Sequence, residues 1–392
     1  MRTAPERRWQ GLLQISLVVF LAQDIAIWLT HGVKGWSDFI TRSDLDYFYD
    51  GAGTWLSGKN PYGVVFGFVT PPLSLIIPAL TLPLSLAHAK LVFIGLNVAL
   101  LTAMLYWLLR SLGFSRYERM CFLLLAALFY PAQRSVLGGN LDTLMLSLML
   151  FAFAMRSKSS PVLLAASVAT KFYSIILLSV VVRHRQWKYL WTAVAGLVVL
   201  LLPFHAFWPA AFHALFRRGV CFSYDSISPA LLLYLVGITS QNVYNSLGLL
   251  FWLATFAGAV YRDRERGFSL HTLAHYVPWM MAWPALVHPY VGVLALVVMA
   301  SLAVRARQRN LNGAEYLSFL GFLLLGLRLS ETTIQVALGY TSYQLAAGVP
   351  AIGVMLMMLG ACFTPTSADD DVERSEVFIS AHAAQTTGTI AQ

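Results

Sequence analysis

"LVFIGLNVALLTAMLYWLL" (residues 91–109) contains no charged side chain and points to the class of fold. A helix needs about 20 apolar residues to cross the hydrocarbon core of a bilayer, and this block is close to that length. Similar apolar blocks occupy residues 12–30 and 189–204. Because such blocks recur along the chain, we expect it to cross the membrane repeatedly as α-helices.

Composition supports an integral membrane protein. Of 392 residues, 58% are hydrophobic and 11% are charged, and the mean hydropathy is +0.66. Soluble domains are about half apolar and about a quarter charged. The net charge of +9 comes from short basic clusters between apolar blocks, which positive-inside bias explains better than nucleic-acid binding does. The clusters are residues 2/7/8, 110/116/119, 156/158, 183/185/188, 262/264/266 and 305/307/309.

The clusters predict an orientation if all of them face the cytoplasm. The first helix then runs outward, residues 31–70 form the first outer loop, and both termini are cytoplasmic. Ten segments would cross once each: 12–30, 91–109, 119–132, 141–155, 189–207, 241–260, 271–286, 289–304, 315–329 and 344–362.

Three apolar pieces fit badly as single crossings: 71–87, 160–182 and 228–237. Basic clusters flank 160–182 on both sides, so it is either one helix that breaks the charge rule or a segment that turns near Lys171 and returns. We therefore predict an all-α polytopic bundle of about 10–13 membrane helices, short or re-entrant ones included.

The chain is expected to form one transmembrane domain, residues 1–363, followed by a polar, disordered tail, 364–392. The first apolar block is long and carries Asp24, so we interpret it as a retained helix and not as a cleaved signal peptide. The three cysteines stand alone in the sequence and indicate neither a disulfide framework nor a zinc site.

"RSDLDYFYDGAGTWLSGKNPYG" (residues 42–63) is unusually acidic for this chain, with Asp44, Asp46 and Asp50 close together. Apolar residues recur at helical spacing, which predicts an amphipathic helix on the membrane surface. Ser43 followed by acidic residues also resembles a helix N-cap and first turn. A structural role therefore stands beside a chemical one for each of these carboxylates.

Other polar residues lie at places where chemistry is plausible. A Lys such as Lys171 inside an apolar segment needs either a wet cavity or a partner that serves folding. His288, beside Pro289, is either an interfacial residue or a phosphate ligand. Asp142 is a helix cap or a substrate contact, and Arg134 is expected to face outward.

A series of motifs follows in order along the chain: Asp44-Leu45, Phe48-Tyr49, Ala52, Leu56, Gly58, Asn60-Pro61-Tyr62, Phe68, Pro71-Pro72, "GNLD" (139–142), "ASVATKFYS" (166–174), "RHRQWK" (183–188) and "WPALVHPYVGVL" (283–294). This series resembles glycosyltransferase family 87, whose members are polytopic enzymes of the GT-C type. The likeness spans roughly residues 40–300, with Asn140 where the family usually has Gln and Ser174 where it usually has Pro.

The resemblance implies an inverting hexosyltransferase that uses a polyprenyl-phosphate sugar on the extracytoplasmic face of the cell membrane. The acceptor would be a lipid or a glycan, and some relatives transfer mannose. The family's catalytic carboxylate corresponds to Asp44. The remaining candidates are contacts to the substrates: Lys171 and His288 near the donor phosphate, Asn140 and Asp142 near the sugar, and Arg134, Tyr62 and Asp46.

The lipid-linked sugar is a substrate, so no cofactor is expected, and neither metal-ligand spacing nor a nucleotide-binding loop is found. The residues leave open the sugar, the acceptor and assistance by a divalent metal. Two other functions fit a polytopic chain with intramembrane charges: a transporter or lipid flippase, and a ligase that transfers a preassembled lipid-linked glycan.

Overall fold

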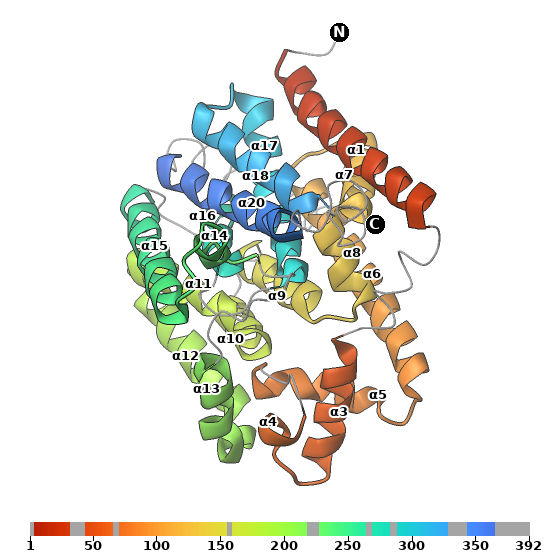
Figure 1. Ribbon diagram of the computed structural model, residues 1–392, viewed down its shortest axis with the longest axis vertical. Coiled ribbons are helices and arrows are strands. Elements are labelled where there is room, and N and C mark those ends of the chain that lie inside the picture. The colour runs from red at the N-terminus through yellow and green to blue at the C-terminus, as the bar shows by residue number, and fades with distance from the viewer. Residues whose placement is uncertain are drawn as a thin grey trace, which may run out of the picture.

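The computed structural model describes residues 4–31, 44–65, 70–154, 159–217, 227–263, 269–282, 288–327 and 343–364. All regular secondary structure within these ranges is helical (Figure 1). The expected tail at 364–392 and the loop residues 32–43 and 66–69 lie outside them, except Thr364. The prediction of an all-α polytopic membrane protein is confirmed.

Five stretches of the described chain are long and apolar enough to cross a membrane. They differ in how much of their surface the protein covers: the stretch in α17 is 89% buried, whereas the one that begins in α12 is 11% buried. The exposed apolar side chains of α12 therefore need lipid, and α17 is a central helix. The stretches lie in α1 (Ala4–His31), α6 (Leu86–Ser111), α12 (Trp187–Leu201) with η3 (Leu202–Phe207) and α13 (Trp208–Arg217), α15 (Gln241–Arg262), and η4 (Pro289–Leu294) with α17 (Ala295–Gln308).

The segment predicted to cross at 119–132 is not one straight helix. It consists of α7 (Arg116–Leu128) and α8 (Tyr130–Leu137), whose axes differ by 70°. Phe129 between them is extended, and Pro131 follows in the first turn of α8. Pro131 has no N–H to donate to the carbonyl oxygen four residues earlier, and its ring would clash with that group, so a straight helix cannot continue from α7 through this position.

Two of the three badly fitting pieces are too short to span. Residues 71–87 contain η1 (Pro72–Leu75) and α5 (Ile76–Thr81), and residues 228–237 contain only α14 (Ala230–Leu235). At about 1.5 Å per residue these helices reach at most about half of a hydrocarbon core of about 30 Å. The third piece breaks at Lys171, between α10 (Ser160–Thr170) and η2 (Phe172–Ile175), which leads into α11 (Ile176–Arg183). The extended backbone at Lys171 lies where one of the two predicted alternatives places a turn, and the return of the segment to the same side stays a prediction.

Shorter apolar helices fill the interior: α9 (Asp142–Ala154), α16 (Leu270–Met281), α18 (Gly313–Gly326) and α20 (Tyr343–Phe363). The α18–α20 pair is the tightest, because a Cβ at Gly353 would lie 2.7 Å from the carbonyl oxygen of Gly321. Small residues permit such close approach of membrane helices. Whether each short helix crosses the bilayer is untested, so the total of 10–13 membrane helices stays a prediction.

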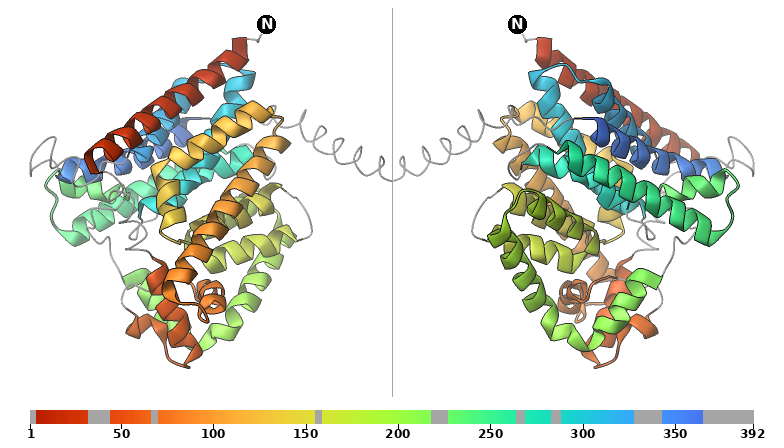
Figure 2. Two further views of the ribbon diagram at one scale, coloured as in Figure 1. Left: turned by 90° about the vertical axis from the view of Figure 1, so that its right-hand side faces the viewer. Right: turned by 90° about the vertical axis from the view of Figure 1, so that its left-hand side faces the viewer.

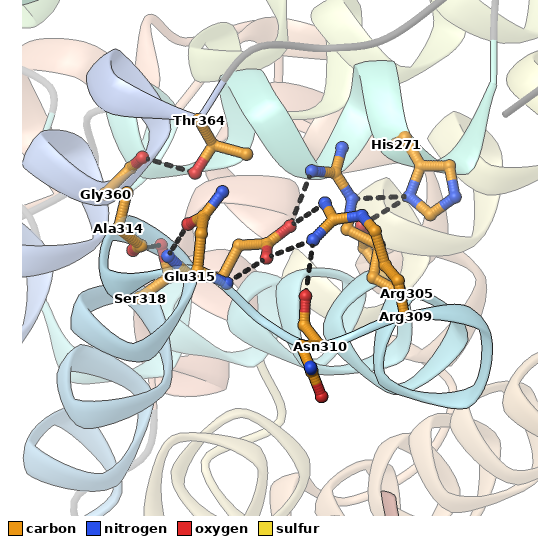
Figure 3. A network of polar contacts seen from close by, with 11 residues as sticks. His271, Arg305, Arg309, Asn310, Ala314, Glu315, Ser318, Gly360 and Thr364 are labelled. Atoms are coloured by element: carbon orange, nitrogen blue, oxygen red, sulfur yellow. Dashed lines mark hydrogen bonds and ion pairs between the residues drawn. The ribbon is translucent and has the colours of Figure 1, made fainter. Parts of the chain in front are cut away.

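Buried ion pairs and hydrogen bonds connect the interior helices. Glu315 at the start of α18 accepts from Arg305 at 2.9 Å and from Arg309 at 2.6 Å (Figure 3). In a second group, Asp263 after α15 accepts from the Tyr276 hydroxyl at 2.8 Å and lies 3.2 Å from His184 Nε2. The first group joins the successive helices α17 and α18, whereas the contact of Asp263 with His184 joins segments 79 residues apart in sequence.

The acidic stretch folds as predicted into a helix, α3 (Leu45–Leu56), followed by α4 (Pro61–Val64). Helices α3, α4 and α5 lie together at the end of the molecule opposite the N-terminus (Figures 1 and 2). Helix α3 packs on α5, η1 and α6, and Tyr49 donates to the Leu84 carbonyl oxygen at 2.6 Å.

Candidate functional site

Asp44 immediately precedes α3, but its side chain does not cap the helix. Its backbone carbonyl oxygen accepts from the amides of Tyr47 and Phe48 at 3.1 and 3.2 Å. The carboxylate instead accepts from Asn140 Nδ2 at 2.5 Å, across 96 positions of sequence. The capping explanation therefore does not describe the side chain of Asp44.

The two neighbouring carboxylates have different surroundings. Asp46 lies 2.9 Å from Lys90 Nζ, an ion pair that attaches α3 to the beginning of α6. Asp50 is exposed on the same helix. Neither shares the hydrogen bond to Asn140, so Asp44 is distinguished from both by its contacts.

Asn140 lies in the turn between α8 and α9, and the geometry of this turn depends on Gly139. Gly139 has φ +62°, and a Cβ there would lie 3.0 Å from Leu45 Cβ. A residue other than glycine would be strained in this conformation and would press against α3. The turn thus brings the start of α3 directly onto Asn140, which is itself fully buried.

Asp142 and Lys171 form a buried ion pair beside this turn. Their charged atoms are 3.6 Å apart, and the side chains are 0% and 3% exposed. Lys171 adopts an extended conformation at the end of α10, where its N–H donates to the Ser167 carbonyl oxygen at 3.0 Å. The sequence predicted either a wet cavity or a partner for Lys171, and the structure shows a carboxylate partner, Asp142.

Aromatic rings surround the ammonium group of Lys171. Its Nζ lies 5.4 Å from the ring centroid of Tyr290, 5.5 Å from that of Phe48 and 6.0 Å from that of Tyr173. Cation–π attraction at these distances stabilises a desolvated ammonium. Tyr290 also forms a side-chain hydrogen bond to Asp44, so it contacts both the cation and the carboxylate.

His288 joins this group through Tyr290. The two rings lie 5.2 Å apart, just before and at the start of η4, which packs against α8 and α9. The structure therefore brings together Asp44, Asn140, Asp142 and Lys171. His288 is linked to this group through its ring contact with Tyr290.

The other candidates have structural contacts. Tyr62 packs against the apolar cluster that includes Leu45 and Phe48 of α3, and its hydroxyl donates to the Thr70 carbonyl oxygen at 2.7 Å. Burial raises the pKa of Tyr62. Arg134 is half-buried in α8, and its carbonyl oxygen accepts from the Gly138 amide at 3.1 Å, which closes the last turn before Asn140.

Sequence reasoning missed Asn97, Tyr173 and Tyr290. Asn97 lies in the apolar block of α6, is 2% exposed, and donates to the Asn140 carbonyl oxygen at 3.0 Å. A lone amide in a membrane helix was the available signal, because such a group needs a partner. Tyr290 was part of the quoted motif, but nothing in the sequence indicated its contact with Asp44.

The group can accept a proton at Asp44 beside a buried positive charge. Within the described ranges, no three His, Cys, Asp or Glu side chains gather as metal ligands.

Comparison with known proteins gives a family for the chain. The sequence profile of glycosyltransferase family 87 matches residues 68–330, about two thirds of the chain. No curated protein matches at a significant level. The match confirms the resemblance drawn from the ordered motifs, and the chain belongs to glycosyltransferase family 87.

Proposed function

We propose that this membrane glycosyltransferase transfers a hexose from a polyprenyl-phosphate donor to a hydroxyl group of a lipid or glycan acceptor, with inversion, and that Asp44 is the general base. The observation that carries the proposal is the hydrogen bond between Asp44 and Asn140 beside the Asp142–Lys171 pair. A helix-capping carboxylate would not need these neighbours.

The proposed step is a displacement at the anomeric carbon of the donor sugar. The acceptor oxygen attacks the anomeric carbon, the bond from that carbon to the donor phosphate oxygen breaks, and the bonding electrons leave with the phosphate. The acceptor proton moves to Asp44, which requires hydrogen-bond reach between the two groups. Attack opposite the leaving phosphate inverts the anomeric centre.

Positive charge near the leaving phosphate stabilises it as it departs. We assign this role to Lys171, assisted by His288 and Arg134. Lys171 is buried against Asp142. In the proposal its charge stabilises the phosphate electrostatically, either across a short distance or after a local rearrangement brings the two groups together. In this proposal Asp142 holds the cation, while Asp46 and Tyr62 support α3.

Charge distribution supports an extracytoplasmic site. Helix α3 lies at the end of the molecule opposite the N-terminus (Figure 2). The N-terminal segment carries Arg2, Arg7 and Arg8, which positive-inside bias assigns to the cytoplasm. Asp44 would then face the compartment where a flipped polyprenyl-phosphate sugar is found.

The decisive experiment compares Asp44→Asn with Asp50→Asn in lipid nanodiscs. Asp50 is a matched control because it lies on the same helix and is exposed. Each protein receives a panel of polyprenyl-phosphate hexoses and a membrane lipid extract, and mass spectrometry identifies new glycosides. We expect Asp44→Asn to lose about 10²- to 10⁴-fold in rate, the range for a lost general base, and Asp50→Asn to keep wild-type activity.

Full activity of Asp44→Asn would remove the assignment of the base. A product that gains several sugars in one turnover would indicate a ligase that uses a preassembled glycan. Movement of the labelled lipid across the membrane without a new glycosidic bond would indicate a flippase.

A further inference from the structure

Asn140 has all four of its polar groups engaged within the protein. Its N–H donates to the Ser135 carbonyl oxygen at 3.0 Å, and its carbonyl oxygen accepts from Asn97. In the side chain, Oδ1 accepts from the Asp142 amide at 3.3 Å and Nδ2 donates to Asp44 at 2.5 Å. With 0% exposure, this residue has no surface to offer a sugar.

The amide of Asn140 can adopt only one orientation. If the group were flipped, its NH₂ would face the Asp142 N–H and its oxygen would face the Asp44 carboxylate, which are both repulsive pairings. The backbone amide of Asp142 thus fixes which end of the side chain points at Asp44. A donor held in this way fixes the orientation of the Asp44 carboxylate.

Asn97 fixes the turn from a different helix. It lies within the membrane stretch of α6, and its Nδ2 reaches the Asn140 carbonyl oxygen at 3.0 Å. A buried amide among apolar neighbours costs free energy unless it is hydrogen-bonded. The hydrogen bond from Asn97 therefore fixes the position of the Asn140 turn along the axis of α6. Asn97 bonds to the backbone of Asn140, whose side chain bonds to Asp44, so Asn97 acts on the carboxylate through Asn140.

We propose that Asn97 and Asn140 are positioning residues that hold the Asp44 carboxylate aimed at the acceptor, and that Asn140 does not bind the sugar. This inference rests on the proposed role of Asp44 as the base. It changes the sequence-based expectation that Asn140 contacts substrate.

The first test is kinetic and uses three variants. Asn140→Ala should lower kcat about 10- to 100-fold, as expected for a lost hydrogen bond to a charged group, with the donor KM changed by less than about twofold. Asn140→Asp keeps the acceptor for the Asp142 amide but replaces the donor by a second carboxylate, so it should lose more. Asn97→Leu, of similar volume, should lower kcat about three- to tenfold.

A control variant separates positioning from general damage. Asn242→Ala removes a side-chain amide at an exposed position of α15 and should leave kcat and the donor KM unchanged. The charged and aromatic groups near Asp44, namely Asp142, Lys171, Tyr173 and Tyr290, remain in every variant.

A second measurement needs no substrate. Dicyclohexylcarbodiimide reacts with protonated carboxyl groups in apolar surroundings, and tandem mass spectrometry localises the adduct to Asp44. At one fixed pH we expect Asp44 to be labelled several times faster in Asn140→Ala than in the wild-type protein, because the carboxylate loses the amide donor that engages it. Asp44→Asn gives the background.

The outcomes distinguish this inference from the proposed function. If no donor supports transfer by the wild-type protein but labelling of Asp44 is faster in Asn140→Ala, the proposed reaction is wrong and the positioning role is right. An unchanged labelling rate in Asn140→Ala and in Asn97→Leu overturns the positioning role, whatever the kinetics. A large rise in donor KM at constant kcat would return Asn140 to sugar binding.

Discussion

The Asp142–Lys171 pair makes a quantitative prediction possible. Both side chains are buried, and their charged atoms lie 3.6 Å apart. At an effective dielectric constant of about 20, two unit charges at this distance attract by about 4–5 kcal/mol. Removal of one partner from a buried pair costs about 3–5 kcal/mol by experience with other proteins, and the two values agree.

We therefore expect Lys171→Met and Asp142→Asn each to lower the free energy of unfolding by about 3–5 kcal/mol. The double variant should lose only about 0–2 kcal/mol, because no uncompensated charge remains in the interior. Unfolding free energies of the four proteins are measured by SDS titration or by steric trapping in bicelles. Sugar transfer is measured in the same preparations.

The cycle also separates folding from catalysis. If Lys171 stabilises the donor phosphate, the double variant should regain stability and remain inactive. Recovery of turnover together with stability would show that the pair serves folding alone. Additive losses in the two single variants, with no coupling between them, would refute the ion pair as the structure presents it.

Three further predictions concern other parts of the fold. Gly139→Ala should destabilise the protein by about 1–2 kcal/mol through its positive φ and contact with Leu45, and should lower transfer, as unfolding and activity assays would show. Burial raises the pKa of Asp263, but the hydrogen bonds from His184 and Tyr276 outweigh burial, and the pKa is lowered overall. The ionised carboxylate therefore stabilises the fold above about pH 4, and this stabilisation is lost on further acidification. Asp263→Asn should flatten the pH dependence of the melting temperature below about pH 4. Glu315→Gln should cost about 3–5 kcal/mol in the free energy of unfolding, because Arg305 stays buried without a carboxylate partner.

Long apolar blocks in the sequence predicted the positions of membrane helices reliably. The blocks at 12–30, 91–109 and 241–260 correspond closely to α1, α6 and α15, because each is long enough for its length alone to predict a membrane helix. Shorter blocks were less informative. The bend at Phe129 needed attention to Pro131, since hydropathy averaged over 119–132 conceals a change of direction.

For the site, motif order was informative and contact geometry was not. Asp44, Asn140 and Lys171 were all selected from the sequence, and the structure brings them together although they come from distant segments. The hydrogen-bond partners of these residues could not be inferred. A buried amide such as Asn97 needs a hydrogen bond, but the sequence does not indicate which backbone group accepts it. The contact between Tyr290 and Asp44 arises in the same way from tertiary packing.

Helix α6 connects the two ends of the candidate site. Lys90, paired with Asp46, and Asn97, bonded to the Asn140 turn, are seven residues apart, which is about 10 Å along the helix axis. Asp44 is tied to both contacts, because it precedes Asp46 by two residues and accepts from the Asn140 side chain. One helix therefore sets the spacing between α3 and the turn that holds the carboxylate, so a change that shifts α6 along its axis would move both together.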